Sequence, residues 1–539
     1  MEKNSFLWII ASAWLLTAGN CYSQNHRFMV FFQEKNSSYN IEDPQEFLSQ
    51  RAIDRRTRQG IEITMEDLPV SQEYISSLEA LGVQVFYTTK WMNGALIQTD
   101  STTLTAIGAL SFVSTVELVA PGPLMAAPET FQKYPNGIQH GRIQSTELQN
   151  HLLGIDLMQQ EGFTGEGMLI GVFDGGFLGV DEIPSFGRLF QNDQVISTFD
   201  FVGNNVDPYR YDDHGTKVLS VIGAYDPGIF TGGAYDADFI LFVTEDVSGE
   251  YRVEEYNWLF AAEMADSIGV DIISTSLGYH VFDDPDMNYS TDDMDGMTAA
   301  VSKAAKIAAS KGILLTVSAG NEGNSSWMTI TAPADVADIL TVGAISEDSV
   351  KASFSSVGPT ADGRIKPDVV ALGVSTAVIN RHGNMVFNNG TSFSAPQIAA
   401  LSAGVWQANP DFNYLQVIQA IRESGHQSQS ADLQTGFGIP NYYETKKLVL
   451  ATDEPGDQWF LKLYPNPVTN SLFILTELPL STVTLFIHNI EGKKYFESKL
   501  ENIPAFTEFS MELPLLSAGI YLVTALTEES AGTYRLIKE

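Results

Sequence analysis

The sequence predicts an α/β protein built on a doubly wound, mostly parallel sheet, with a smaller domain before it and another after it. Two observations point to the central sheet. Apolar runs typical of buried strands, such as 168–173 and 312–318, alternate with segments of helical apolar spacing, such as 214–223. At 539 residues, the chain is also too long for one ordinary domain.

The first residues have the pattern of a secretory signal peptide. Lys3 precedes an apolar stretch over 6–18, which is too short for a membrane span, and we place cleavage near Ser23. The alternative is lipidation of Cys21, but Asn20 departs from the small residue that such a site requires. Cleavage near Ser23 would remove the only cysteine and leave an exported protein without a disulfide.

The leading and trailing regions have their own patterns. Between 27 and 118, strand signals (27–32, 83–86, 94–98 and 112–118) alternate with helix signals (43–60 and 71–81), which predicts a small α+β domain. After residue 460 there are only short alternating runs separated by turns, at 471–475, 483–489, 507–513, 519–524 and 534–537. This pattern predicts a β-sandwich.

Composition limits the classes of partner. The hydrophobic fraction is 44%, as in globular proteins, and the net charge is −36. Such a charge repels phosphates, so we expect no nucleic-acid partner. The acidity fits an extracellular protein.

A serine lies where a nucleophile is expected. Ser392 follows Gly390-Thr391 and opens a helix of small apolar residues, whose N-terminal N–H groups favour negative charge on an attacked oxygen. Taken singly, Ser392 is more simply read as a helix N-cap. Ser394 is the rival nucleophile.

Three further residues supply the chemistry that a serine nucleophile needs. Asp174 ends the strand-like run 168–173, His214 precedes a helix, and Asn321 follows the strand-like run 312–318. An imidazole takes the serine proton, a carboxylate orients the imidazole, and an amide donates to the oxyanion. Singly they read as a strand-end cap, a helix-terminal histidine and a turn residue; jointly and in this order they favour catalysis.

These four segments resemble the signature blocks of the subtilisin-like serine peptidases, over roughly 154–443. The resemblance implies a triad of Asp174, His214 and Ser392, with Asn321 in the oxyanion hole, and no required cofactor. Two positions depart from the family pattern. Gly175 stands where Thr or Ser usually supports the carboxylate, and Lys217 stands where the His-Gly-Thr block usually continues with His.

The resemblance also implies a substrate groove. One wall corresponds to Ser276, Leu277 and Gly278, and the other to Ser318, Ala319 and Gly320. The first wall would pair with an extended peptide through backbone hydrogen bonds. Neither wall carries a charge and both are made largely of small residues, so we predict a broad apolar preference at the residue before the scissile bond (P1).

The segment 282–296 contains six aspartates. Carboxylate clusters suit Ca²⁺, which many subtilases carry, but this spacing does not match an EF-hand loop. We interpret the segment as a solvated acidic loop and assign no metal ligands, with calcium as the alternative.

Two more resemblances complete the organisation. The leading domain resembles the subtilase propeptide, against the alternative of an accessory domain that stays attached. The Tyr464-Pro465-Asn466-Pro467 opening and the strand-like 519–523 resemble the sorting domain of type IX secretion, against a plain binding sandwich. The predicted parts are a signal peptide (1–23), a propeptide-like domain (24–120), a linker (121–153), a peptidase domain (154–450), a linker (451–460) and a sorting sandwich (461–539).

Taken together, the sequence predicts a secreted or surface-attached serine endopeptidase. Its predicted partners are protein or peptide substrates, its own propeptide and the outer-membrane secretion machinery. The rival hypothesis is a catalytically weak surface binding protein on the same scaffold, for which Gly175 is the only support in the sequence.

Overall fold

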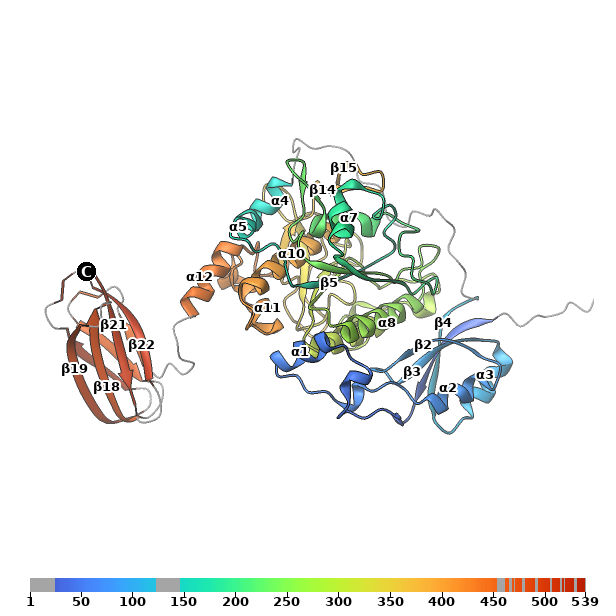
Figure 1. Ribbon diagram of the computed structural model, residues 1–539, viewed down its shortest axis with the longest axis horizontal. Coiled ribbons are helices and arrows are strands. Elements are labelled where there is room, and N and C mark those ends of the chain that lie inside the picture. The colour runs from blue at the N-terminus through green and yellow to red at the C-terminus, as the bar shows by residue number, and fades with distance from the viewer. Residues whose placement is uncertain are drawn as a thin grey trace, which may run out of the picture. The chain divides into compact units, whose positions relative to one another are not determined.

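The structure is a computed structural model that describes residues 25–122 and 146–452 and, with short gaps, residues 461–538 (Figure 1). The predicted signal peptide, most of the linker 121–153, and residues 453–460 lie outside the described residues. Contacts divide the chain into two units, 1–443 and 444–539, which are described separately.

The first unit is built on a seven-stranded sheet in the order β13-β12-β11-β10-β5-β9-β6, and every neighbouring pair in it is parallel. Its strands are β5 (Leu169–Asp174), β6 (Val195–Asp200), β9 (Asp238–Val243), β10 (Ile272–Thr275), β11 (Leu314–Ser318), β12 (Leu340–Ile345) and β13 (Val369–Leu372). The chain adds β6 and β9 on one side of β5 and continues from β10 on the other. The strand order therefore reverses beside β5, where an open α/β sheet forms its crevice.

Helices cover both faces of this sheet. On one face, α7 (His214–Gly223) and α10 (Thr391–Ala408) share a core with Ile170 and Val172. On the other face, α8 (Val253–Ile268) and α9 (Ala300–Ser310) share a core with Leu169 and Phe173. Successive β5 side chains thus point into opposite cores, which explains why this strand reads as a continuous apolar run. The predicted fold class is confirmed.

Other elements complete the peptidase part of this unit. Short helices α4 (Glu147–Leu152) and α5 (Ile155–Gln160) precede β5, and α6 (Gly187–Gln191) precedes β6. The hairpin β14–β15 (Thr376–Ile379 and Met385–Asn388) precedes α10. The remaining elements are the two-stranded ribbon β7–β8 (Tyr225–Asp226 and Phe230–Thr231) and α11 (Tyr414–Glu423), while α12 (Tyr442–Thr452) begins at the end of this unit and runs into the second.

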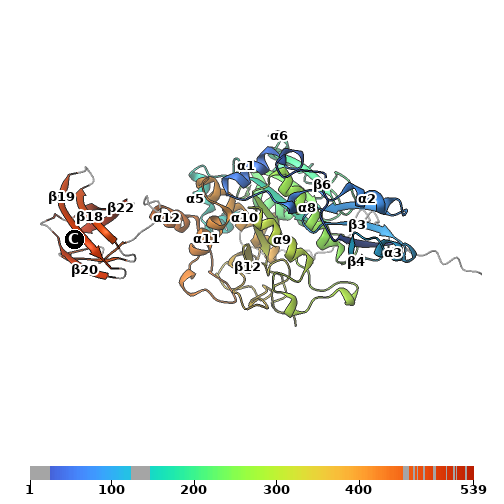
Figure 2. The same cartoon turned by 90° about the horizontal axis from the view of Figure 1, so that it is seen from below.

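The leading domain is the predicted α+β unit. Its four strands form an antiparallel sheet in the order β2-β3-β1-β4, comprising β1 (His26–Phe32), β2 (Gln84–Thr89), β3 (Gly94–Thr99) and β4 (Val113–Ala120). Helices α2 (Gln72–Glu79) and α3 (Ser101–Gly108) belong to the same domain, whose core includes Val30 and Ile97. Figures 1 and 2 show this domain against α8.

The helix predicted from Asp43 to Gly60 was wrong at its start. Asp43 precedes only a 3₁₀ turn (Pro44–Glu46), and α1 runs over Gln50–Arg58. Ser49 is the N-cap, because its hydroxyl accepts the Ala52 N–H at 3.1 Å while donating to the Ile268 carbonyl at 2.7 Å. A tertiary contact with the end of α8 therefore selects the cap, and local sequence does not show that contact.

The C-terminal unit contains two antiparallel sheets, β16-β17-β20 and β19-β18-β21-β22. Their strands are β16 (Leu461–Tyr464), β17 (Ser471–Thr476), β18 (Leu480–Asn489), β19 (Lys494–Ile503), β20 (Thr507–Glu512), β21 (Gly519–Leu526) and β22 (Ala531–Lys538). Leu472 of one sheet and Leu485 and Val523 of the other bury into one core, as in a sandwich. Strand β19, at a sheet edge, was missed by the sequence analysis.

Candidate functional site

The side chains of Asp174 and His214 meet at the carboxyl end of the central sheet. Asp174 is the last residue of β5, and His214 is the first residue of α7. The His214 Nδ1 atom lies 2.8 Å from one carboxylate oxygen of Asp174 and 3.0 Å from the other. Both residues are buried. Because Nδ1 faces a carboxylate, the imidazole is held with Nε2 directed away from Asp174.

A glycine makes this approach possible. A Cβ atom on Gly215 would lie 2.9 Å from the Asp174 Cβ and 2.5 Å from the Gly176 carbonyl oxygen. The first turn of α7 can therefore lie against the end of β5 only with glycine directly after His214. This is the physical reason for the His-Gly pair in the sequence.

Ser392 lies in the first turn of α10, after the N-cap Gly390, whose φ is +149°. Its hydroxyl donates to the Ser276 carbonyl at 3.3 Å, and the Ser276 hydroxyl donates to the Ser392 carbonyl at 2.8 Å. Phe393, the next residue, has its ring centroid 5.7 Å from that of His214. Helix α10 packs on α7, so the serine and the histidine enter the site from neighbouring helices.

Asn321 lies just beyond the end of β11 and is exposed. Its side-chain oxygen accepts hydrogen bonds from the N–H and the hydroxyl of Thr391, both at 3.0 Å. These two bonds fix the plane of the amide beside the first turn of α10. The Asn321 NH₂ group is then the part of the side chain left to face a ligand.

The structure gives local explanations for the two departures from the family pattern. The N–H of Gly175 donates to the Asp174 carboxylate at 2.8 Å, so the backbone provides support of the kind a hydroxyl gives in the family. Lys217 is buried and pairs with Asp213 at 2.7 Å, one helical turn earlier. Neither change removes the contact between Asp174 and His214.

Electrostatics favour a positive charge on His214. Burial lowers the pKa of His214, and Lys217 lowers it further. The carboxylates of Asp174 and Asp212 act in the opposite direction and outweigh both effects, so the pKa of His214 lies above its usual value.

The two segments predicted as groove walls follow adjacent parallel strands, β10 and β11. Ser276 and Leu277 are buried, and Gly278 is exposed. In the second segment Ser318 and Ala319 are buried, and the Ser318 hydroxyl donates to the Leu277 carbonyl at 3.4 Å. The two segments thus contact each other directly.

Thr331, which the sequence analysis missed, lies between these two segments. A Cβ atom on Gly278 would lie 2.2 Å from the Thr331 hydroxyl oxygen, and one on Gly320 would lie 3.0 Å from it. This hydroxyl is buried without a hydrogen-bond partner. No sequence motif marks Thr331, because its position depends on backbone bonds to both segments: its N–H donates to the Ala319 carbonyl at 3.3 Å, and Ala332 pairs with Tyr279.

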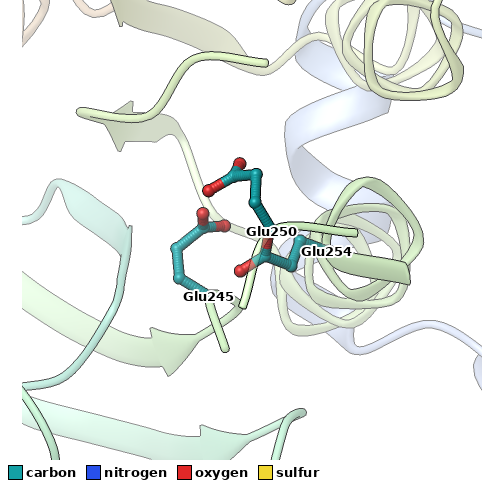
Figure 3. Close-up of side chains that lie close together, drawn as sticks. All are labelled: Glu245, Glu250 and Glu254. Carbon is teal, nitrogen blue, oxygen red and sulfur yellow. The ribbon is translucent and has the colours of Figure 1, made fainter. Parts of the chain in front are cut away.

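Carboxylates gather in the acidic loop and in a separate group of glutamates. In the loop, Asp293 accepts the N–H of Ser290 at 2.7 Å, and Asp295 accepts that of Met297 at 2.7 Å. Figure 3 shows Glu245, Glu250 and Glu254 gathered at the first turn of α8, with one oxygen of each within 4.8 Å of the others. Their oxygens have the chemistry that Ca²⁺ prefers, although the sequence analysis had singled out only the loop.

Comparisons with known proteins agree with this geometry. The model of the subtilase family matches residues 165–439. A model of the peptidase S8 propeptide domain of Bacteroidota matches 27–133, and a model of a secretion system C-terminal sorting domain matches 462–539. The protein is therefore secreted or attached to the cell surface. Among the described residues, no helix has the length and apolar character needed to cross a membrane.

Individual relatives are serine proteases. Serine protease AprX of Bacillus subtilis is 28% identical over 54% of this chain and 67% of its own length. Subtilisin NAT of Bacillus subtilis subsp. natto is 30% identical over 48% of this chain, which spans only 61% of that relative. Among solved structures, MycP1 from the ESX-1 type VII secretion system matches with a TM-score of 0.44 and 21% identity, over 60% of this chain and 93% of its own.

Proposed function

Because the chain belongs to the subtilase family of serine peptidases, we propose that it is a secreted endopeptidase that uses Ser392 as its nucleophile. The observation that carries this proposal is the bond between Asp174 and His214, made beside the helix that presents Ser392. A buried carboxylate at Nδ1 leaves the basic Nε2 on the far side of the ring from Asp174, where it can accept a proton.

The proposed reaction has two halves. In the first, Ser392 Oγ bonds to the peptide carbonyl carbon while its proton moves to His214 Nε2. The C–N bond then breaks, and His214 donates that proton to the leaving amine. In the second, water loses a proton to His214 and attacks the acyl-enzyme, which releases the acid and restores the Ser392 hydroxyl.

The oxyanion formed in each half is assigned to two donors, the Asn321 NH₂ group and the Ser392 N–H. Support comes from the clamp on Asn321, whose side-chain oxygen is held by Thr391 at 3.0 Å. A donor that is already oriented needs no reorganisation when the charge develops. The position of Ser392 in the first turn of α10 adds the favourable end of that helix dipole.

We further propose an apolar P1 preference limited by Thr331. The two walls carry no charged side chain, and Thr331 fills space between Gly278 and Gly320. Because the Thr331 side chain occupies part of the space between the walls, we expect small and medium P1 side chains to fit better than large ones. Thr331→Gly should therefore raise kcat/KM for Phe at P1 by about tenfold relative to Ala at P1. Differences of about one methylene group in an apolar pocket change discrimination by at least that factor.

Peptide libraries with varied P1 residues measure this preference. Thr331→Ser is the matched control, because it keeps the hydroxyl and removes only the methyl group. A cleavage profile dominated by Lys or Arg at P1 would contradict the apolar assignment in the parent enzyme.

The remaining parts of the proposal concern partners and ions. The leading domain is the enzyme's own propeptide partner, cleaved within 121–153, and the C-terminal domain engages the outer-membrane secretion machinery. The mechanism requires no organic cofactor. Calcium stays a prediction: thermal unfolding of the mature enzyme with EDTA, with and without added Ca²⁺, tests it, and an unchanged Tm would exclude a stabilising calcium ion.

Hydrolysis of casein tests the proposed function. The parent enzyme and Ser394→Ala should both cleave casein and shorten their own chains, as seen by intact mass. Ser392→Ala should do neither, although it removes a single oxygen atom. Equal activity of the parent and Ser392→Ala would contradict the assignment, and an inactive parent would favour the binding-protein alternative, for which Gly175 is weak support given its bond to Asp174.

A further inference from the structure

A second carboxylate lies beside His214. Asp212 is 97% buried, with 3% of its surface exposed, in the loop that leads into α7. One of its side-chain oxygens accepts the backbone N–H of His214 at 2.7 Å. The other oxygen is buried and has no hydrogen-bond partner.

Holding a carboxylate this way is unfavourable unless something offsets it. A buried, ionised group that lacks part of its hydrogen bonding loses solvation that the folded chain does not fully replace. A neutral asparagine has the same shape and would accept the same N–H. The hydrogen bond to the His214 backbone N–H therefore does not by itself explain why residue 212 carries a negative charge.

The loop is built to keep Asp212 in this position. A Cβ atom on Gly176 would lie 2.2 Å from the Arg210 carbonyl and 2.9 Å from both the N and the O atom of Asp212, so residues 210–212 lie directly on the turn after Asp174. The N–H of Leu178 donates to the Asp212 carbonyl at 3.2 Å. The segment after β5 thereby holds both carboxylates against His214, Asp174 at the imidazole and Asp212 at the backbone N–H.

We propose that Asp212 is a positioning residue that supports the proton transfer proposed above, by stabilising His214 in its protonated form through its charge as well as by accepting the backbone N–H of His214. The proposal rests on the proposed function of His214 as the general base. Asp174 orients the ring through Nδ1, and Asp212 acts from the backbone side of the same histidine.

The charged groups around His214 agree with this role. Asp174 at the end of β5 and Asp212 both favour the imidazolium, whereas Lys217 of α7 opposes it. Asp213 is paired with Lys217 and moderates that opposition. Burial, Asp174 and Asp213 raise the pKa of Asp212 above its usual value, whereas positive charge on His214 lowers it, so a charge on either residue favours the opposite charge on the other.

The test replaces Asp212 with asparagine. Asp212→Asn keeps an acceptor for the His214 N–H and removes the charge, so the imidazolium becomes less stable. We expect the acid limb of the kcat/KM profile to move to lower pH, and the alkaline plateau to fall by roughly tenfold, because one nearby charge is lost from the transition state. Asp193→Asn is the control: Asp193 is exposed and has a φ of +54°, a conformation that asparagine also tolerates.

A second measurement does not depend on activity. NMR titration of the His214 imidazole in a Ser392→Ala background should give a lower pKa when Asp212→Asn is added and no change when Asp193→Asn is added. A parent that is inactive on all substrates would refute the proposed function, while this titration would still decide the role of Asp212. If Asp212→Asn does not fold, Asp212→Ser takes its place, because serine also caps helices. An unchanged titration in a folded Asp212 variant overturns the proposal.

Discussion

Two buried groups of charges lie on different sides of the first unit, and they differ in how they are built. At the catalytic side, Asp174 and His214 come from the end of a strand and the start of a helix, each beside a glycine. At the opposite side, Arg55 and Arg56 of α1 reach Asp266 of α8 at 2.6 and 2.7 Å. The first group centres on one carboxylate–imidazole bond, whereas the second is a network that joins two domains.

The wider network shows what holds the leading domain in place. Lys90 also pairs with Asp266 at 3.2 Å. Glu263 of α8 accepts the N–H groups of Lys90 and Trp91 at 2.9 and 3.0 Å and the Thr89 hydroxyl at 2.5 Å. Cationic groups of the leading domain thus meet carboxylates on one helix of the peptidase domain. Here the leading domain also contributes a carboxylate: Glu117 of β4 accepts a hydrogen bond from the Tyr256 hydroxyl of α8 at 2.7 Å.

The comparison shows that buried charges are used differently in the two regions: for proposed catalysis in one and for domain contact in the other. The proposed catalytic pair lies near other charged groups that change the pKa of His214, as the proposed general base requires. In the interface, each buried carboxylate has several partners and is not proposed to gain or lose a proton, as a stable domain contact requires. Changes in the two regions should therefore separate activity from assembly.

The largest expected effect is on assembly, from Arg55→Ala. The Arg55 side chain is 1% exposed, and its loss leaves Asp266 with one cation fewer in a buried site. Breaking a buried pair costs about 3–5 kcal/mol. Thermal unfolding of the proenzyme in a Ser392→Ala background, which should not process itself, measures the loss.

Arg51→Ala is the matched control, one turn earlier on α1. Arg51 also pairs with a peptidase-domain carboxylate, Asp271, but its side chain is 40% exposed. An exposed pair contributes only about 0–1 kcal/mol. Equal destabilisation by the two variants would show that burial does not distinguish these pairs.

The next effect is on activity alone, from Asn321→Ala. We expect kcat to fall by about 10²–10³, a range measured for one oxyanion donor in subtilisin, a member of this family, and transferred here. Because Asn321 is exposed, the Tm should change little. Peptide hydrolysis by the mature enzyme and its thermal unfolding give the two values, and a large drop in Tm would assign Asn321 a structural role instead.

A smaller effect appears only in acid, from Asp266→Asn. Burial alone would raise the pKa of Asp266, but Lys90, Arg55 and Arg56 outweigh it and lower the pKa to about 2. The unfolded value is about 3.9, so the carboxylate contributes its full stability above about pH 4 and loses it as the pH falls toward 2. Denaturation of the Ser392→Ala proenzyme at several pH values should show the parent's advantage over Asp266→Asn shrinking below pH 4. An advantage that is constant down to pH 2 would contradict the ionic account.

The sequence predicts the catalytic region better than the interface for a physical reason. Asp174, His214 and Ser392 each stand in a short segment whose strand, glycine or helix start is local, so their neighbours in the chain indicate the roles that we propose for them. Arg55 and Asp266 are 211 positions apart and show no local pattern.

One detail of the site and one of the fold also depend on tertiary contacts. Thr331 is held beside the predicted groove walls by the bond from its N–H to the Ala319 carbonyl, and the start of α1 at Gln50 depends on a bond from Ser49 to the end of α8. The edge strand β19 was missed although exposed and partly buried residues alternate along much of it, because it exposes most of its side chains and only its last residue is buried. Short apolar patterns predict cores well and edges poorly.

The central claim is that Ser392 is an activated nucleophile, and covalent labelling tests it most directly. The mature parent enzyme should react with one equivalent of a fluorophosphonate, and peptide mass spectrometry should place the added mass on Ser392, because only a serine whose proton His214 can take reacts at a useful rate. His214→Ala should abolish labelling, and Ser394→Ala should not affect it. Labelling of Ser394 in the parent, or equal labelling of the parent and His214→Ala, would contradict the account.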